Sequence, residues 1–152
     1  IHECHGSIHH LQCLDGCSDV VWSVEKFKPE VDENECHLTN MPPPCKECGG
    51  YARPNILMFG DWGWVNMRTK RQAARQHEWL STVKRPLVIE LGAGIHIPSV
   101  RKFSEKIVTQ HNGRLIRINP RESEVNNRED VGLACGALEG LQAIAKTLNS
   151  KQ

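Results

Sequence analysis

Four cysteines constrain the fold of this chain more than any other feature. They stand as Cys13-x3-Cys17 and, after a long excursion, as Cys45-x2-Cys48. Each short spacing lets one turn present two sulfurs, and the excursion brings the second turn round to the other side of a tetrahedral ion. The spacing therefore predicts a small zinc-ribbon module with four thiolate ligands and a structural Zn²⁺.

The total cysteine count supports zinc over disulfides. There are seven cysteines, an odd number, whereas a secreted disulfide framework favours an even number in a shorter chain. Four cysteines on zinc leave three free thiols, at Cys4, Cys36 and Cys135. This arrangement predicts a reducing, cytoplasmic compartment. His9 or His10 could compete as a metal ligand.

Composition excludes several classes of partner. The chain is 39% apolar and 24% charged, which is typical of a globular protein. It has no apolar run long enough to cross a bilayer, so we expect no membrane association. The net charge of +1 gives no electrostatic basis for binding nucleic acid. The oligomeric state stays open.

Two regions differ in composition, and we expect domains at 1–52 and 53–152. We interpret residues 1–12 as the end of a loop, and residues 13–50 as a loop-rich module with an extended piece at 20–22. The second region holds alternating elements with short turns between them. We expect strands at 55–59, 86–91 and 114–119, and helices at 67–83, from Pro98 onward and at 136–148.

This order predicts an α/β fold with a partial Rossmann-like parallel sheet. Three strands are too few for a well-buried, doubly wound sheet. We therefore expect the missing strands to precede Ile1, in an amino-terminal part that is absent here. The chain would then be the carboxy-terminal part of a longer protein.

Three segments are candidates for holding a nucleotide. Gly92-Ala93-Gly94 follows a strand and precedes a helix, where backbone N–H groups can approach a phosphate, although such a turn is often only a tight turn. Asn119 could bind a ribose hydroxyl at the end of the next strand, or simply form a turn before Pro120. Leu138, at the start of the last helix, could cover an adenine or pack in the core.

A fourth candidate is His5, which Gly6 follows. The glycine suggests a bend that exposes the imidazole, and histidine suits general base chemistry near neutral pH. The chain has eight histidines, however, and only its position distinguishes His5. Trp62 and Trp64 could line a peptide groove or cap the junction between the two regions.

Taken in order, these pieces resemble the sirtuins, the NAD-dependent protein deacylases. The resemblance covers most of the chain, from Glu3 to Leu148. It is carried by Cys4-His5-Gly6-Ser7, the paired cysteines with Gly49-Gly50, Arg53-Pro54, Phe59-Gly60-Asp61, the strand into Gly92, Pro98 and Ile118-Asn119.

The resemblance implies a function for each piece. His5 would be the base that deprotonates a ribose hydroxyl after the acyl oxygen of an acyl-lysine protein or peptide has displaced nicotinamide from NAD. The products would be deacylated lysine and O-acyl-ADP-ribose. NAD would contact Gly92, Ala93, Gly94, Asn119 and Leu138, while substrate backbone would pair with an extended segment formed by Met58, Phe59, Gly60 and Asp61. The ligands of the structural zinc would be Cys13, Cys17, Cys45 and Cys48.

The chain departs from the family pattern at several of these positions. Gly92-Ala93-Gly94 stands where the family usually has Gly-Thr-Ser, so two hydroxyl donors are lost. Asp61 replaces a glutamate, and Glu122 is displaced by one position. Two alternatives to deacylation therefore stay open: a sirtuin-like protein mono-ADP-ribosyltransferase, and an inactive zinc-stabilised binding module.

Overall fold

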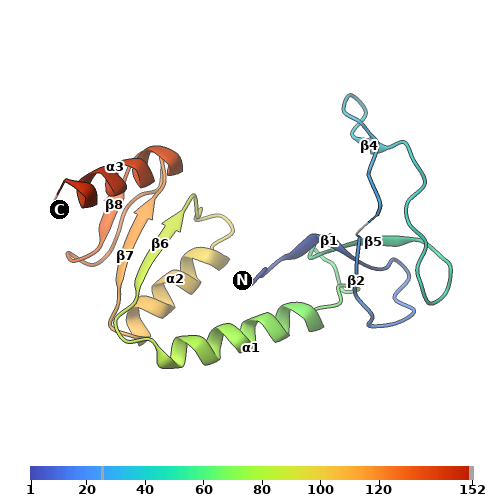
Figure 1. The fold of residues 1–152 in the computed structure, drawn as a ribbon, viewed down its shortest axis with the longest axis horizontal. Coiled ribbons are helices and arrows are strands. Elements are labelled where there is room, and N and C mark those ends of the chain that lie inside the picture. Colours follow the sequence, from blue (N-terminus) through green and yellow to red (C-terminus); the bar gives the residue numbers. More distant parts are fainter. Residues whose placement is uncertain (25, 151–152) are drawn as a thin grey trace. The chain divides into compact units, whose positions relative to one another are not determined.

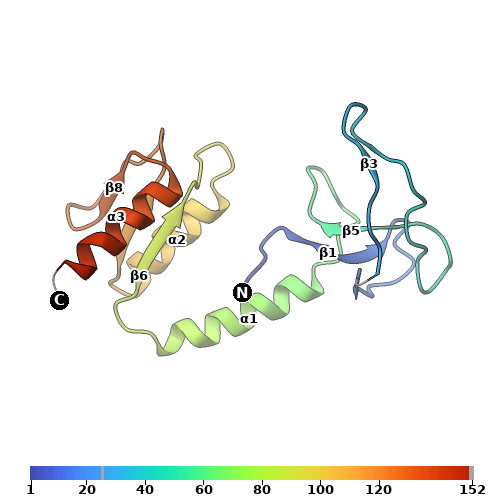
Figure 2. The ribbon, with the colours of Figure 1, turned by 45° about the horizontal axis from the view of Figure 1, so that its top comes forward.

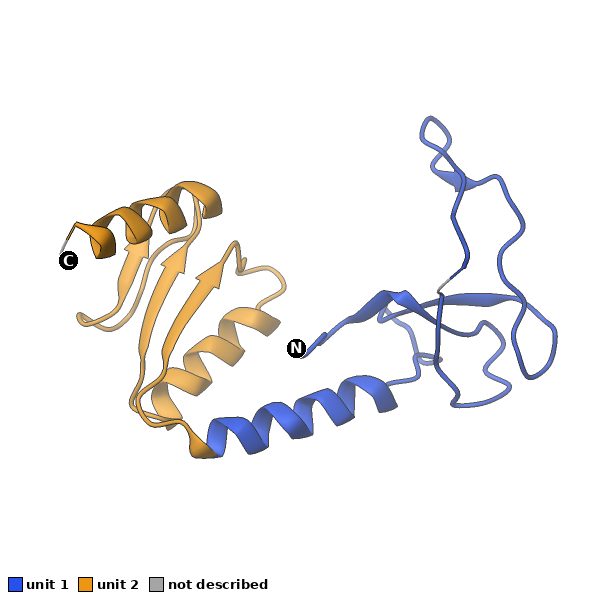
Figure 3. Cartoon of the chain, viewed as in Figure 1, with its two compact units in different colours: residues 1–81 blue, residues 82–152 orange. Residues whose placement is uncertain are grey.

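The computed structural model describes residues 1–24 and 26–150, which form two compact units (Figure 3). Unit 1 is Ile1–Ser81 and unit 2 is Thr82–Gln152. The expected boundary after residue 52 does not coincide with this division, because a strand of unit 1, β5 (Ala52–Ile56), runs across it. Within the described residues, no helix has the length and apolar content needed to cross a membrane.

Unit 1 is built on an antiparallel sheet with the order β2-β1-β5 (Figure 1). The long strand β1 (Gly6–Cys13) lies between β2 (Trp22–Ser23) and β5. The expectation that residues 1–12 form a loop is therefore wrong. Hydrophobic alternation does not reveal this strand, because its buried positions include the polar side chains of Ser7 and Gln12.

The strand expected at 55–59 begins earlier, at Ala52, and ends at Ile56. It pairs antiparallel with β1, placing Ile56 opposite Gly6 and Ala52 opposite Cys13, so it does not belong to the parallel sheet. The excursion between the cysteine pairs carries a small two-stranded ladder of β3 (Val31–Asp32) and β4 (His37–Leu38). The extended piece expected at 20–22 corresponds to β2, which starts at Trp22.

Helix α1 (Met67–Thr82) ends unit 1 close to the expected bounds, but it buries different residues. Helical periodicity of the sequence predicts a stripe of Ala73, His77, Leu80 and Lys84, and of these only Leu80 is buried. Thr69 and Gln72 are buried instead, because the first half of α1 packs through hydrogen bonds rather than apolar contacts.

Unit 2 confirms the α/β class with a parallel sheet of order β6-β7-β8 (Figure 1), and Figure 2 shows the same unit in a turned view. The third strand was not expected from the sequence. In chain order the elements of this unit are β6 (Leu87–Leu91), α2 (Ser99–Gln110), β7 (Arg114–Ile118), β8 (Val131–Leu133) and α3 (Ala137–Asn149).

The two helices cover opposite faces of this sheet. Arg117 of β7 contacts Glu105 of α2, while Ile118, the next residue, packs against Gly140 of α3. Successive strand residues point to opposite faces, so the helices lie on different sides. Gly140 is required there, because an added Cβ would lie 2.8 Å from the Ile118 side chain.

Strand β6 is less buried than its apolar sequence suggests, because it lies at the edge of the described sheet. Leu87, Ile89 and Leu91 are 59%, 44% and 45% exposed. They alternate with Val88 and Glu90, so they share the face of the sheet that α3 covers elsewhere. The face of β6 that carries Leu87, Ile89 and Leu91 is therefore only partly covered.

Candidate functional site

The four paired cysteines come together in unit 1. Their sulfurs all lie within 4.8 Å of one another, with 3.8 Å between Cys13 and Cys48 and 3.6 Å between Cys17 and Cys45. Four sulfurs about 2.3 Å from a tetrahedral Zn²⁺ lie about 3.8 Å apart. The cluster therefore fits a structural zinc ion with no open coordination position. Neither His9 nor His10 belongs to it.

Two tight turns and the end of a strand position these sulfurs. Cys13 ends β1, and Gly16 at φ 66° turns the chain toward Cys17. The second turn closes with hydrogen bonds from Gly49 N to Cys45 O, at 3.0 Å, and from Cys45 N to the Gly50 carbonyl, at 2.6 Å. The metal site is thus built into the sheet.

The metal cluster also contributes to the hydrophobic core of unit 1. This core consists of Leu11, Cys13, Trp22, Cys45 and Ala52. Two of these five residues are candidate metal ligands. The metal site and the small hydrophobic core therefore share two residues, Cys13 and Cys45.

The thiols of the cluster titrate very differently when no cation is present. The backbone N–H of Cys17 lowers the pKa of Cys13 to about 7. The interaction with Cys13, together with burial, raises the pKa of Cys17 to about 12. One thiolate makes the next one harder to form, whereas a bound dication favours all four thiolates at once.

His5 lies exposed in a turn immediately before β1. Gly6 has φ 86°, and a Cβ at this position would lie 2.0 Å from the carbonyl oxygen of Asn55, so only glycine fits. The carbonyl of His5 accepts a hydrogen bond of 2.9 Å from Leu57 N. The Cys4 sulfur lies 3.7 Å from His5 Nδ1. The turn is therefore fixed to the end of β5.

Glu3 anchors the same turn to α1. Its N–H donates to Gln72 Oε1 at 2.9 Å, its carboxylate accepts from Gln72 Nε2 at 2.8 Å, and its carbonyl accepts from Thr69 Oγ1 at 3.2 Å. Arg68 adds an ion pair to the carboxylate. The hydrogen bond from Gln72 lowers the pKa of Glu3 to about 2. We call these contacts the Glu3 clamp. The sequence analysis did not predict them.

Residues 58–61 form an exposed turn after β5, so the expectation of an extended segment here is wrong. Gly60 adopts φ 68°, and Asp61 N donates to the Met58 carbonyl at 3.2 Å. Phe59 is 90% exposed. Asp61 accepts from Arg53 at 2.9 Å and from Gly63 N at 3.0 Å, and these bonds hold the chain in the turn. Burial opposes ionisation of Asp61, but the Arg53 guanidinium keeps its pKa below the usual value.

A buried amide network supports this turn from below. Gln12 Oε1 accepts from Asn55 Nδ2 at 2.9 Å and from Val65 N at 3.0 Å, while Gln12 Nε2 donates to the Gly63 carbonyl at 2.7 Å. Asn55 Nδ2 also donates to the Val65 carbonyl at 2.8 Å. Both amide side chains are fully buried. The network fixes residues 63–65, which follow the exposed turn, to β1 and β5.

Unit 2 brings the expected nucleotide-binding residues to the carboxyl edge of its sheet. Gly92 turns the chain at φ 66°, and its N–H donates to the Ile118 carbonyl at 2.9 Å. The Ala93 carbonyl points inward and accepts from Asn119 Nδ2 at 3.3 Å and from Arg101 Nη2 at 3.1 Å. Hydrogen bonds from Asn119 and Arg101 therefore fix the glycine turn from its buried side.

The side chain of Asn119 makes several hydrogen bonds within unit 2. Besides its bond to Ala93, its Oδ1 accepts from Arg121 N at 2.9 Å and from Glu122 N at 3.0 Å. Its side chain is buried and shapes the 119–122 turn. Glu122 reaches back to the glycine turn, where its carboxylate accepts from Ile95 N at 2.9 Å.

Leu138 lies in the first turn of α3, which follows β8 at the same edge, and it is 70% exposed. Core packing therefore does not account for it. Gly136 is the N-cap of α3, where it adopts an extended conformation. Unit 2 thus carries Gly92, Ala93, Gly94, Asn119 and Leu138, whereas unit 1 carries the metal cluster, His5 and the 58–61 turn.

Comparison with known proteins gives one consistent result. The model of the Sir2 family matches residues 1–89. The chain belongs to the Sir2 family. Sirtuins that resemble it include an NAD-dependent protein deacetylase of Caldivirga maquilingensis, 29% identical over 93% of this chain and 49% of the relative. An NAD-dependent protein deacylase of Aquifex aeolicus is 25% identical over 98% of this chain and 54% of the relative.

Solved sirtuin structures share the fold. A Sir2 homologue in complex with NAD superimposes with a TM-score of 0.60 at 21% identity, covering 97% of this chain and 50% of that chain. Sir2Tm bound to a propionylated peptide gives 0.58 at 20% identity, covering 95% and 54%. The chain spans about half the length of the curated relatives it matches.

Beyond the family pattern, the structure brings forward residues that sequence reasoning did not single out. Arg101 and the buried pair of Glu90 and Arg117 belong to unit 2, and Gln12 and Asn55 belong to unit 1. One signal was available for Glu90 and Arg117, because each interrupts an apolar strand sequence. No comparable signal marks Gln12 or Asn55.

Proposed function

We propose that this chain is part of an NAD-dependent protein-lysine deacylase. The observation that carries the proposal is the His5 turn, which presents an exposed imidazole and is hydrogen-bonded to the segment that leads into residues 58–61. Membership of the Sir2 family, whose relatives here are named deacetylases and deacylases, supports this interpretation.

In this proposal His5 is the general base. An exposed ring on a fixed backbone can accept a proton from a hydroxyl group without rearrangement of the chain. Gly6 and the Glu3 clamp fix that backbone at two points. Their role is therefore to hold the base rather than to react.

NAD is the proposed cofactor; when bound, it would supply the ADP-ribosyl group that accepts the acyl group, with nicotinamide as the leaving group. Gly92, Ala93 and Gly94 would offer backbone N–H groups to phosphate, since the turn has no hydroxyl side chain. Asn119 would shape the ribose side of the edge, and Leu138 would cover the adenine.

The proposed substrate is an acyl-lysine in a protein or peptide. Similar sirtuin structures hold a propionylated peptide and a p53 peptide. In this chain Met58, Phe59, Gly60 and Asp61 would contact the peptide through an exposed turn on which Phe59 is the most exposed apolar side chain.

Zinc has a structural role in this proposal, because four thiolates leave no position for water. We retain the proposed division of function, with the catalytic turn and the metal module in residues 1–52 and the carboxy-terminal part of an NAD-binding domain in residues 53–152. None of the seven cysteines forms a disulfide in the described residues, and this supports a reducing, cytoplasmic location.

Nicotinamide release from NAD in the presence of an acetyl-lysine peptide tests the proposal, with the full natural protein that contains this chain. We expect His5→Ala to lower the rate at least about a hundredfold, the usual share of a general base. His9→Ala is the matched control, because His9 is an exposed histidine in the next strand.

Two results would reject deacylation, and a third would reject His5 as the base. Equal activity of His5→Ala and the unmodified protein would mean that His5 is not the general base. Labelled NAD that marks a protein target without loss of acyl groups would indicate an ADP-ribosyltransferase. Peptide binding with one zinc per chain and no turnover of NAD would indicate a binding module.

A further inference from the structure

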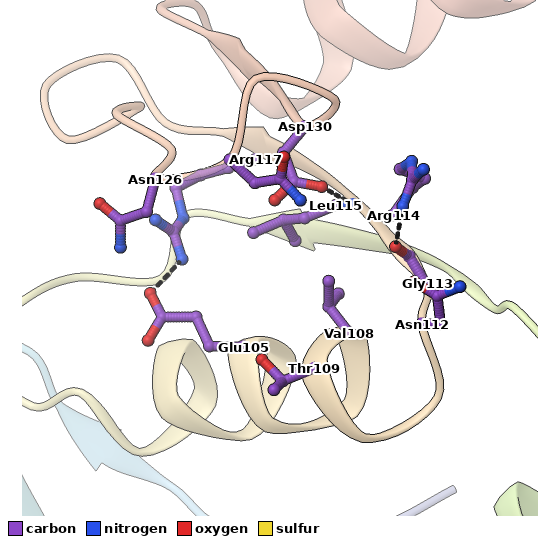
Figure 4. A pocket seen from close by; sticks show the side chains of 11 residues that line it. Glu105, Val108, Thr109, Asn112, Gly113, Arg114, Leu115, Arg117, Asn126 and Asp130 are labelled. Carbon is purple, nitrogen blue, oxygen red and sulfur yellow. Dashed lines mark hydrogen bonds and ion pairs between the residues drawn. The ribbon is translucent and has the colours of Figure 1, made fainter.

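Arg117 is buried in the middle of unit 2 and connects three segments of the chain. Its Nε donates to Glu90 Oε1 at 2.5 Å, and its Nη2 donates to Glu90 Oε2 at 3.4 Å and to Glu105 Oε1 at 3.1 Å. Its Nη1 donates to the Glu124 carbonyl at 2.7 Å. Figure 4 shows the contact with Glu105 of α2. β6, α2 and the loop after β7 therefore meet at one side chain.

An open pocket lies between α2 and β7 on one side of this contact. Its volume is about 480 Å³, and Glu105, Val108, Leu115 and Arg117 are among its lining residues (Figure 4). The contacts of Arg117 therefore connect α2 to the sheet where apolar side chains do not fill the space.

Glu90 and Arg117 are also the feature that marks the register of β6 against β7. They stand directly opposite each other in the parallel pair. Apart from Glu90 and the two arginines, the strand sequences Leu87–Leu91 and Arg114–Ile118 are aliphatic. Aliphatic residues on both faces specify register weakly, because a shifted pairing still buries apolar surface. A shift would leave two charges buried without partners.

Stability alone does not explain this pair. Removing a carboxylate and a guanidinium from water is costly, and apolar residues of similar size often replace such pairs without loss of stability. An aliphatic pair would also match the neighbouring residues. The pair is better explained by a requirement for one particular alignment of the two strands.

The alignment determines the geometry of the carboxyl edge. Glu90 lies two residues before Gly92, and Arg117 lies two residues before Asn119, so the pair lies next to the two turns of this edge. Beyond the pair, Gly92 N reaches the Ile118 carbonyl, and Asn119 reaches the Ala93 carbonyl. The contact with Glu124 fixes the loop that carries Glu122.

We propose that Arg117 is a positioning residue, which through Glu90, Glu105 and Glu124 sets the register of β6 and β7 and so aligns Gly92 with Asn119. The alignment as such does not depend on the function of the edge. The statement that it serves the binding of NAD rests on the proposed function.

The test replaces both charges together, as Glu90→Leu with Arg117→Met, in the full natural protein. Hydrogen exchange is followed at the bonded amides of Gly92, Ile95, Asn119 and Glu122, with urea unfolding and NAD titration alongside. We expect a folded protein in which these amides exchange at least tenfold faster and NAD binds at least tenfold more weakly. Leu115→Ala is the control for lost stability, because Leu115 is buried on the same face.

Each outcome is decisive. Unchanged exchange at the edge in a folded double variant would overturn the proposal, as would equal loosening in Leu115→Ala. Faster exchange together with no NAD binding by the unmodified protein would support the positioning role and reject the cofactor. If the double variant does not fold, Arg117→Lys keeps the charge but cannot reach all three partners. Unchanged edge exchange in that variant would also overturn the proposal.

Discussion

A single missing side chain, that of Gly6, determines where the imidazole of His5 lies. A Cβ on Gly6 would lie 2.0 Å from the backbone oxygen of Asn55, and φ is 86°. Both the backbone conformation and the space exclude a side chain here. The presence of His-Gly was read from the sequence, but the reason for the glycine, the close approach of β5, depends on a contact far along the chain.

Gly6→Ala should therefore cost at least about 2 kcal/mol of stability. Urea unfolding measures the loss. Gly60→Ala is the matched control, because Gly60 also has positive φ, 68°, but has open space around it, so it should cost only about 1 kcal/mol. Equal losses in the two variants would show that the approach to Asn55 is not tight.

Glu3 should make the stability of unit 1 depend on acid. Its pKa is lowered from 4.5 to about 2 in the folded chain, chiefly by Gln72. A lowered folded pKa stabilises the protein fully above the unfolded value, and this contribution is lost as pH falls from about 4.5 toward 2. Urea midpoints measured from pH 6 to 3 should fall less steeply for Glu3→Gln than for the unmodified chain. Glu33→Gln, an exposed carboxylate, should not change the slope. Parallel slopes for Glu3→Gln and the unmodified chain would contradict the clamp.

At the scale of elements, polar contacts rather than apolar faces decide how unit 1 is assembled. β1 buries Ser7 and Gln12, and α1 buries Thr69 and Gln72. Periodicity therefore predicted the extent of α1 but not its buried face, and it missed β1 entirely. In unit 2 the strands β6 and β7, the start of α2 and both ends of α3 were predicted closely, because their apolar residues and glycines follow ordinary patterns.

Gln12→Met should destabilise the β1–β5 pair and the loop it supports. The change removes an acceptor for Asn55 and Val65 and a donor for Gly63 while keeping a similar volume. Buried groups left without partners cost about 1 to 3 kcal/mol each, so we expect a total near 3 kcal/mol. Thermal unfolding measures it, and Gln142→Met, on the exposed face of α3, should have little effect. A loss below about 1 kcal/mol would mean that the network is replaced by other contacts.

At the scale of the whole molecule, the two compact units depend on different sources of stability. Unit 1 has a small core in which two metal-site cysteines take part, whereas unit 2 has a sheet covered by two helices. The cysteine spacing was sufficient to predict the metal cluster, because ligand geometry is local. The third strand of unit 2, β8, has only three residues with Gly132 at its centre, so it could not be predicted from the sequence.

Removal of zinc should therefore act on one unit. We expect a chelator to abolish protection from hydrogen exchange in residues 13–50 first, while β6 and β7 keep theirs, since metal ligation supplies folding free energy to the smaller module. Cys45→Ser should mimic the chelator. Metal analysis that finds no zinc, or four thiols that react freely in the native protein, would reject the metal centre.

The paired strands β1 and β5 connect the metal site to the His5 turn but keep the two far apart. Cys13 lies at one end of β1 and Gly6 at the other, and seven residue steps of a strand span about 23 Å. An ion at one end of this ribbon is thus well removed from His5 at the other. Co²⁺ exchanged into the thiolate cage would therefore be a coloured reporter of the metal site that takes no part in bond making at the His5 turn.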